Sequence, residues 1–108
     1  MQYMPVYKKI IPYKADFRLE GTTFTFSFFY NSSGDYFTVD LEQNGEVLAV
    51  GEKVVYGSPL FITYLDDRFP LRAIVPFDLS EECERVGWRE LEEDVFLYVL
   101  EAGDFVEA

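Results

Sequence analysis

The sequence predicts an all-β fold, either a small antiparallel β-sandwich or a partly open barrel of roughly seven or eight strands, with one short helix. Three observations support this prediction. The chain of 108 residues fits one domain that can bury a single core. It contains 11 Phe and 8 Tyr residues, and aromatic side chains favour strands. Apolar and polar residues alternate through most of residues 17–47, and turn signals divide this region into segments of similar length.

Residues 1–13 are predicted to form an extended N-terminal arm or an edge strand. Pro5 and Pro12 lack a backbone donor and fix the dihedral angle φ, which disfavours a central strand. We expect this arm to precede one β domain over residues 14–101 and a C-terminal tail over residues 102–108. The apolar side chains of the arm are expected to pack on this domain or on a neighbouring subunit. They are Met4, Val6, Ile10 and Ile11.

The next two segments predict a β-hairpin with a tight turn. Phe17 and Leu19 alternate with charged residues in segment 16–20, which is the pattern of a half-buried strand. Gly21 supplies the positive φ that the turn requires. Segment 22–31 begins with phenylalanines at every second position, and a helix would scatter these around its circumference. A bulge or a strand end is expected at residues 29–30, where the alternation breaks.

Two further turn signals extend this hairpin into a meander. The sequence Asn-Ser-Ser-Gly at residues 31–34 is typical of a turn. Apolar and polar residues alternate again in segment 36–42. Asn44 and Gly45 then form a strong hairpin signal, because a type I′ turn needs positive φ at both positions. With the returning segment 46–50, the pattern predicts four consecutive antiparallel strands.

The second half of the chain is less regular. Segments 60–65 and 71–75 are strand-like, and a polar tip at residues 66–68 separates them. Asp78 or Ser80 can accept hydrogen bonds from the first amides of a helix, so we expect a short helix near residues 79–86. Segment 94–100 predicts a closing strand that is buried on much of its surface.

The charge of the chain disfavours direct binding to nucleic acid. The formal net charge is −11, and residues 78–108 contain 11 acidic and two basic residues. Binding to a phosphate backbone requires a basic surface instead. An acidic surface next to DNA can repel DNA or imitate it, so an acidic DNA-mimic inhibitor is one alternative function. The acids also keep a protein rich in phenylalanine in solution.

The residue types also make enzymatic and metal chemistry improbable on sequence grounds. There is no His and only one Cys, so the commonest general base and metal ligand are missing. We therefore expect no enzymatic activity, no cofactor and no metal. The sequence contains no apolar run long enough to predict a membrane span. Its first residues lack the basic-then-apolar order that is typical of a signal peptide. A carbohydrate-binding β module is a second alternative function, with aromatic candidates Tyr30, Tyr36, Tyr56, Tyr64 and Trp88.

Several motifs together resemble the phage baseplate plug family, a small β domain of contractile-tailed phages. The resemblance covers about residues 15–100, and the order and spacing of the pieces carry it more than any single piece. The sequence departs from the family pattern at residues 36–37, where Tyr-Phe replaces an expected Trp. The matching motifs are LEG (19–21), TTFTFSFFYN (22–31), SGDYFTVDLEQNG (33–45), LAVG (48–51), GSPL (57–60) and LYV (97–99).

The resemblance implies a structural virion protein without enzymatic activity. Such plugs lie with the hub at the distal end of the tail tube and help to close its channel. The implied partners are other baseplate proteins (hub, spike and wedge), with several copies per particle. The implied location is the virion tail baseplate, after synthesis in the host cytoplasm.

Two sets of residues follow as candidate sites under this reading. One is a possible partner interface, expected from apolar side chains on the surface. The other is a possible set of acids that face the channel, where like charge would discourage DNA from adhering. The interface candidates are Tyr3, Met4, Val6, Tyr7, Ile10, Trp88 and Phe105, and the channel-facing candidates are Glu90, Glu92, Glu93 and Asp94.

Overall fold

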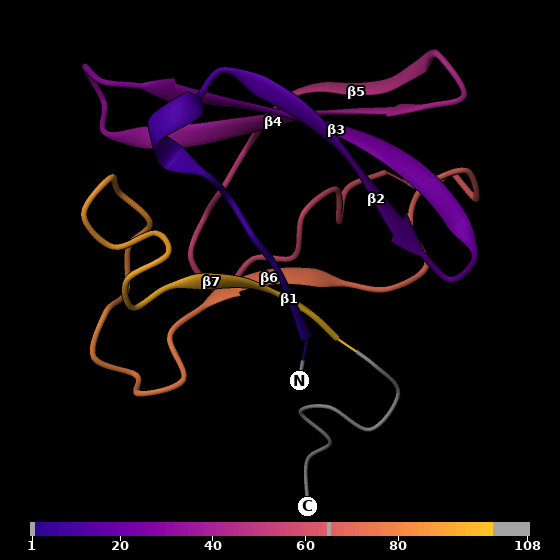
Figure 1. Cartoon of the computed structure of the whole chain (residues 1–108). Coiled ribbons are helices and arrows are strands. Elements are labelled where there is room, and N and C mark those ends of the chain that lie inside the picture. Colours follow the sequence, from indigo (N-terminus) through magenta and orange to yellow (C-terminus); the bar gives the residue numbers. More distant parts are fainter. Residues whose placement is uncertain (1, 65, 101–108) are drawn as a thin grey trace, which may run out of the picture.

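The computed structural model describes residues 2–64 and 66–100, which form two antiparallel β-sheets packed face to face (Figure 1). The larger sheet has the strand order β2-β3-β4-β5, and the smaller sheet has the order β1-β7-β6. The sheets do not close into a barrel, so the all-β prediction is confirmed in its sandwich form. The elements are β1 (Gln2–Met4), the 3-10 helix η1 (Lys8–Ile10), β2 (Tyr13–Leu19), β3 (Thr22–Asn31), β4 (Tyr36–Gln43), β5 (Glu46–Lys53), β6 (Ile74–Phe77) and β7 (Phe96–Val99).

The larger sheet is the predicted meander. The turn between β2 and β3 places Glu20 at φ 52° and Gly21 at φ 78°. The turn between β4 and β5 places Asn44 at φ 50° and Gly45 at φ 78°, the pair of positive angles that a type I′ turn requires. The pairing of β2 with β3 is continuous, so side chains alternate in phase across these two strands. The pairing of β4 with β5 shifts register between Val39 and Leu41 and again between Leu41 and Glu42.

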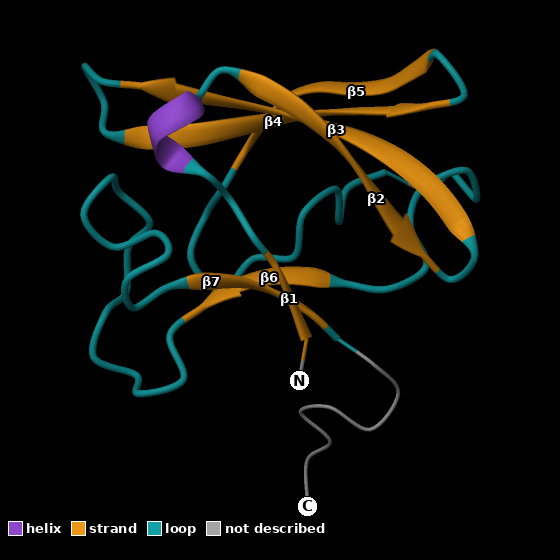
Figure 2. Cartoon of the chain, in the orientation of Figure 1, coloured by secondary structure: helices purple, strands orange, loops and turns teal. Residues whose placement is uncertain are grey.

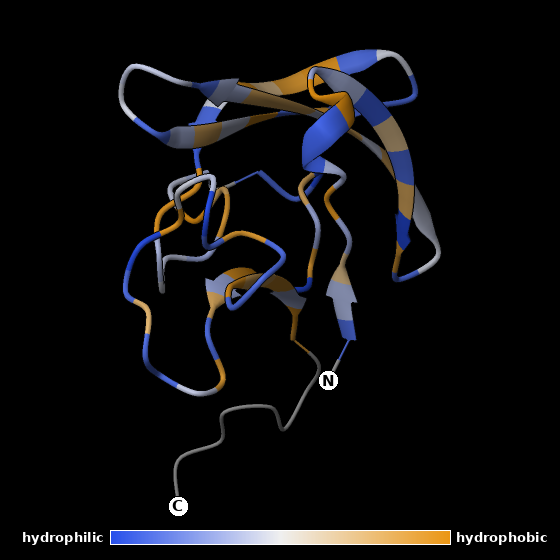
Figure 3. Cartoon of the chain, turned by 60° about the vertical axis from the view of Figure 1, so that its left-hand side comes forward, coloured by the Kyte–Doolittle hydropathy of each residue, from blue (hydrophilic) through white to orange (hydrophobic). Residues whose placement is uncertain are grey.

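The strands of the larger sheet supply eight of the 20 buried core residues that the structure describes. Phe24, Phe26 and Phe28 of β3 are all buried, as their alternation predicts. Burial of one such side chain contributes roughly 1.5–3 kcal/mol to folding. Figure 3 shows the alternation of apolar and polar residues along the strands of this sheet. The smaller sheet contributes Leu97 and Val99 to the same core.

The N-terminal arm is an integral part of the smaller sheet. Strand β1 pairs with β7 in the register Gln2↔Val99 and Met4↔Leu97. Met4 and Val6 are buried in the common core of the domain. From β1 the chain crosses to η1, which lies beside the larger sheet (Figure 1). The arm therefore connects the two layers of the sandwich.

The region between β5 and β6 corrects two strand predictions. Residues 60–63 form turns and no strand follows at Tyr64, because Phe61 adopts a left-handed φ of 64° and is buried together with its neighbour Leu60. Leu65 lies outside the described residues. The predicted strand at 71–75 begins only at Ile74, and Leu71 is 81% exposed.

The short helix predicted near residues 79–86 is wrong. Glu81 has φ 60°, which cannot continue a right-handed helix. Asp78 does act as a cap, but it organises a turn. Within the part of the chain that the structure describes, η1 is the only helix (Figure 2). The Asp78 carboxylate accepts hydrogen bonds from the backbone N–H groups of Ser80, Glu82 and Cys83 at 2.9, 3.1 and 2.9 Å.

Candidate partner interface

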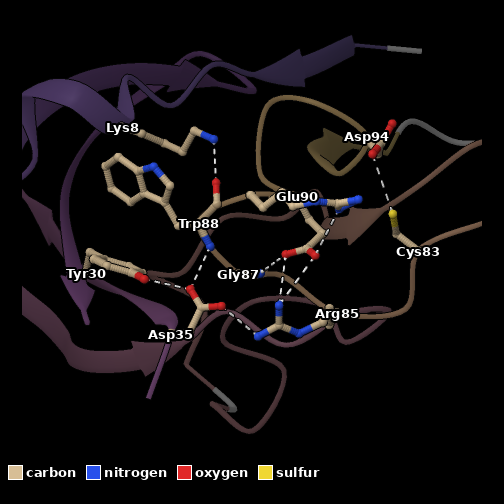
Figure 4. Close-up of polar contacts among 10 residues, drawn as sticks. Lys8, Tyr30, Asp35, Cys83, Arg85, Gly87, Trp88, Glu90 and Asp94 are labelled. Carbon is tan, nitrogen blue, oxygen red and sulfur yellow. Dashed lines mark hydrogen bonds and ion pairs between the residues drawn. The ribbon is translucent and has the colours of Figure 1, made fainter. Parts of the chain in front are cut away.

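A polar network centred on Asp35 joins the β3–β4 turn to the loop between β6 and β7 (Figure 4). Asp35 Oδ1 accepts hydrogen bonds from the Tyr30 hydroxyl at 2.6 Å and from the backbone N–H of Trp88 at 2.8 Å. Asp35 Oδ2 accepts a third from Arg85 Nη2 at 2.8 Å. The Tyr30 hydrogen bond is the largest cause that lowers the pKa of the Asp35 carboxyl, which falls to about 2. Asp35 is therefore an ionised anchor for the loop at neutral pH.

The local sequence explains why Asp35 faces this loop. The backbone N–H of Gly34 donates to Asn31 Oδ1 at 2.9 Å, which closes the turn that follows β3. Asp35 itself adopts φ 54°, a conformation that Asp tolerates better than most residues. The predicted turn at residues 31–34 is confirmed, and its geometry directs the next side chain toward Arg85 and Trp88.

A buried carboxylate supports the other side of the same loop. Glu90 is 6% exposed, and its Oε1 accepts from the backbone N–H of Gly87 at 3.0 Å and from Arg85 Nη1 at 3.2 Å. A Cβ atom at position 87 would lie 2.5 Å from Asp35 Oδ2 and 2.8 Å from Glu90 Oε1. A side chain at this position would therefore have to displace the ends of Asp35, Arg85 and Glu90, and would disturb the network.

Trp88 is held in place from several sides. Its ring lies 4.9 Å from the Tyr30 ring and 6.1 Å from the buried Phe37 ring, measured between centroids. Lys8 Nζ lies 5.4 Å from the centroid of the indole and donates to the backbone carbonyl of Trp88 at 2.5 Å. The cation–π contact and the hydrogen bond attach η1 to the loop. The indole is nevertheless 38% exposed, so a fixed aromatic ring lies on the surface.

An open groove lies between η1, β3 and Trp88. Its volume is about 440 Å³. None of the described residues that line it is acidic, and Lys8 and Lys9 are its charged residues. The neighbouring Tyr7 and Ile10 are also largely exposed. We call this feature the η1 groove, and its lining residues are Lys8, Lys9, Ile11, Pro12, Phe29, Tyr30 and Trp88.

The structure separates the predicted interface residues into two groups. Tyr7, Ile10 and Trp88 are exposed in or near the η1 groove. Tyr3 is also exposed, on β1, where it packs beside Phe96. Phe105 lies outside the described residues. The remaining two, Met4 and Val6, are buried in the core and do not reach the surface.

The four acids proposed to face a channel do not share one environment. Glu90 is not on the surface, because it is buried in the network described above. Glu92 is partly buried, and its Oε2 accepts from the backbone N–H of Val6 at 3.0 Å. Burial is the largest cause that raises the pKa of Glu92. Glu93 and Asp94 are exposed. Asp94 Oδ2 also accepts a weak hydrogen bond from Cys83 Sγ at 3.6 Å (Figure 4).

Several residues of this region were missed by the sequence reasoning. Asp35 and Arg85 gave no signal, because the contacts of Asp35 with Arg85 and with the backbone of Trp88 join residues 50 and 53 positions apart. Phe29 did give one, since it places an apolar residue where the alternation of the sequence expects a polar one. The bulge or strand end expected at residues 29–30 is wrong, because β3 pairs continuously with β4 through these positions, and the Phe29 side chain is therefore directed outward and exposed. Lys8 and Lys9 are adjacent basic residues in an acidic chain, but their proximity to Trp88 depends on the fold.

The two carbohydrate-binding candidates at the η1 groove, Tyr30 and Trp88, do not lie in one plane. The Tyr30 and Trp88 rings are inclined at 58°, so they do not form the coplanar platform that a sugar ring would need. Within residues 2–64 and 66–100, no cluster of three or more potential metal ligands is found. No helix in the same described ranges is long and apolar enough to cross a membrane.

Comparison with protein families gives one match. A family model described as the cyanophage baseplate Pam3 plug gp18 matches residues 1–102 of the chain. No curated protein matches the sequence.

Proposed function

Because the chain belongs to this family of cyanophage baseplate plugs, we propose that it closes the distal channel of the tail tube in a contractile phage tail. The observation that carries the proposal is the family match over residues 1–102, which includes the N-terminal arm and both sheets. Family membership supports a structural role in a phage baseplate and a location in the virion tail. Contact with hub, spike and wedge proteins, several copies per particle, synthesis in the host cytoplasm and the absence of catalysis are further parts of our proposal.

The dense packing of the domain is consistent with a rigid structural component that fills a channel. Its core is built from phenylalanines and branched aliphatic residues of both sheets, and such cores have the packing density of organic crystals. A block of this kind resists deformation when neighbouring proteins press on it.

The acidic character of the chain suits a channel that must later pass DNA. The net charge of −11 repels the phosphate backbone, and Glu93 and Asp94 are exposed where they can contribute to this effect. We therefore propose that the exposed acids discourage adhesion of DNA to the plug. Glu90 is excluded from this role because it is buried.

Purified tails provide the direct test. Mass spectrometry of intact particles should detect the chain, and cryo-microscopy should show its two-layered sandwich at the distal end of the tube. Intact tails without the chain, or density that leaves the channel open beside it, would refute the proposed plug.

A further inference from the structure

The η1 groove combines an apolar, aromatic lining with positive charge. Its floor and walls are apolar and aromatic, and its only charged lining residues within the described chain are Lys8 and Lys9. Lys8 already contacts the Trp88 ring and carbonyl, whereas Lys9 is exposed and makes no ion pair with any residue that the structure describes. A complementary occupant must therefore bring both an apolar side chain and a carboxylate.

The groove is arranged before any occupant arrives. Trp88 is fixed by its backbone hydrogen bond to Asp35, by the Tyr30 ring and by Lys8. A fixed aromatic side chain loses little conformational entropy when a partner covers it, which is typical of residues that contribute most to binding. The exposed Phe29 continues the same apolar surface along β3.

We propose that the η1 groove binds the C-terminal segment of a neighbouring copy of this chain, with Phe105 against Trp88 and Phe29. The sequence of residues 101–108 is EAGDFVEA. It places an aromatic residue between Asp104 and Glu107, so it offers the apolar side chain and the carboxylates that the groove lacks. This inference rests on the proposed function, because it requires copies that meet in a baseplate.

The direction of β7 favours a neighbouring copy over the same chain. Val99 pairs with Gln2, at the end of the arm that lies farthest from η1. Phe105 follows Val99 by six residues, and reversing direction consumes two or more of them, which leaves a reach of about 13 Å. From Gln2 to Lys8 the chain spans about 20 Å if it is mostly extended. The groove of the same molecule is therefore out of range for Phe105.

Trp88 gives a direct readout of binding, because it is the only tryptophan in the chain. The experiment uses the full chain carrying Phe105→Ala, so that its own tail does not compete, and titrates a synthetic peptide of residues 100–108. We expect a saturable change in Trp88 emission. A matched peptide with Phe105→Ala should bind at least tenfold more weakly. Equal responses to the two peptides, or no saturable response at millimolar peptide, would overturn the inference.

A pair of charge variants tests the role of the groove itself. Lys9→Glu in the same host should weaken peptide binding several-fold, and added salt should weaken it as well. Arg18→Glu makes the same charge change at an exposed position of β2, outside the groove, and should leave binding nearly unchanged. An equal effect of both variants would contradict a specific contact and overturn the inference.

Two further measurements separate this inference from the proposed function. Sedimentation of the unmodified chain should show association that Phe105→Ala removes. A monomer that shows peptide-bound emission at every concentration would indicate intramolecular docking and overturn the inference. If the chain is found in intact tails but the peptide does not bind, the inference about the groove is wrong and the proposed plug function is retained. If the peptide binds but intact tails lack the chain, the proposed plug function is wrong instead.

Discussion

Asp35 is a single residue on which the geometry of the candidate interface depends. It accepts hydrogen bonds from Tyr30, from Arg85 and from the backbone of Trp88. Asp35→Asn removes the negative charge and one acceptor oxygen, so we expect a lower melting temperature and a Trp88 emission maximum at longer wavelength. Asp67→Asn makes the same charge change at an exposed position and serves as the control. Identical behaviour of the two variants would show that Asp35 does not anchor the loop.

The acids with lowered pKa values predict how stability depends on low pH. Asp35 and Asp78 each have a pKa of about 2, for Asp35 chiefly because of Tyr30 and for Asp78 chiefly because of Ser80. A carboxyl whose pKa is lowered by folding stabilises the fold fully above its unfolded pKa, near 4, and loses this contribution as the pH falls to its folded value. The free energy of unfolding, measured with denaturant, should therefore decrease between about pH 4 and pH 2. Asp35→Asn should make this decrease shallower, and an unchanged slope would contradict the assignment.

Glu92 should behave in the opposite way. Burial raises its pKa, so the folded state holds the proton more tightly and loses stability as the pH rises above the unfolded value. Glu92→Gln keeps an oxygen that can accept the N–H of Val6 but removes the charge. At pH 7 we expect the free energy of unfolding of Glu92→Gln to equal or exceed that of the unmodified chain. At pH 4 we expect the variant to show no increase in this free energy. Glu93→Gln at the exposed neighbour is the control, and a clear loss of stability in Glu92→Gln at pH 7 would show that the ionised form is favoured.

At the scale of elements, β1 determines whether the arm is a structural strand or a detachable extension. Met4 is buried between the sheets, so Met4→Ala should lower the free energy of unfolding by about 2–5 kcal/mol in a denaturant titration. Gln2→Ala, at an exposed position of the same strand, should change it by less than about 0.5 kcal/mol. A negligible effect of Met4→Ala would mean that β1 can leave the sheet without cost.

The elements that sequence could predict are those fixed by neighbouring residues. Strands β2 to β5 follow from local alternation and from two-residue turns such as Asn44–Gly45, so all four were predicted. The bounds of β3 and β4 agree within one residue, whereas β2 begins three residues before the predicted segment and β5 ends three residues after it. Strand β6 could not be placed in the same way, because Ile74 pairs with Val99 across 25 positions and no local pattern marks where pairing begins. The helix predicted after Asp78 failed because one cap signal serves both helices and turns.

Local sequence patterns also predicted only part of the candidate interface. Tyr7, Ile10 and Trp88 were predicted from their apolar character alone, and they are exposed near one groove. Asp35 was not predicted as part of this site, since its contacts with Arg85 and Trp88 join residues 50 and 53 positions apart in the sequence. Buried Met4 and Val6 looked like interface residues because sequence cannot tell which apolar side chains of an arm the domain itself covers.

At the scale of the whole molecule, the proposed interface can be tested with two exposed isoleucines. Ile10 beside the η1 groove and Ile62 in the loop before β6 are 59% and 60% exposed. Ile10→Asp should reduce the amount of chain in purified tails several-fold, because it places a charge in the contact surface. Ile62→Asp should leave incorporation near normal. Quantitative mass spectrometry measures both, and the reverse result would move the interface to the Ile62 loop.

The pairing of β1 with β7 has a consequence for synthesis. The ribosome releases Gln2–Met4 before their partner Phe96–Val99, which follows only after more than 90 further residues. The β2–β5 meander uses only short-range pairing and can form while the chain is still growing. A product that stops before Phe96 leaves the phenylalanine face of that meander uncovered, which marks it for chaperones and proteases rather than for particle assembly.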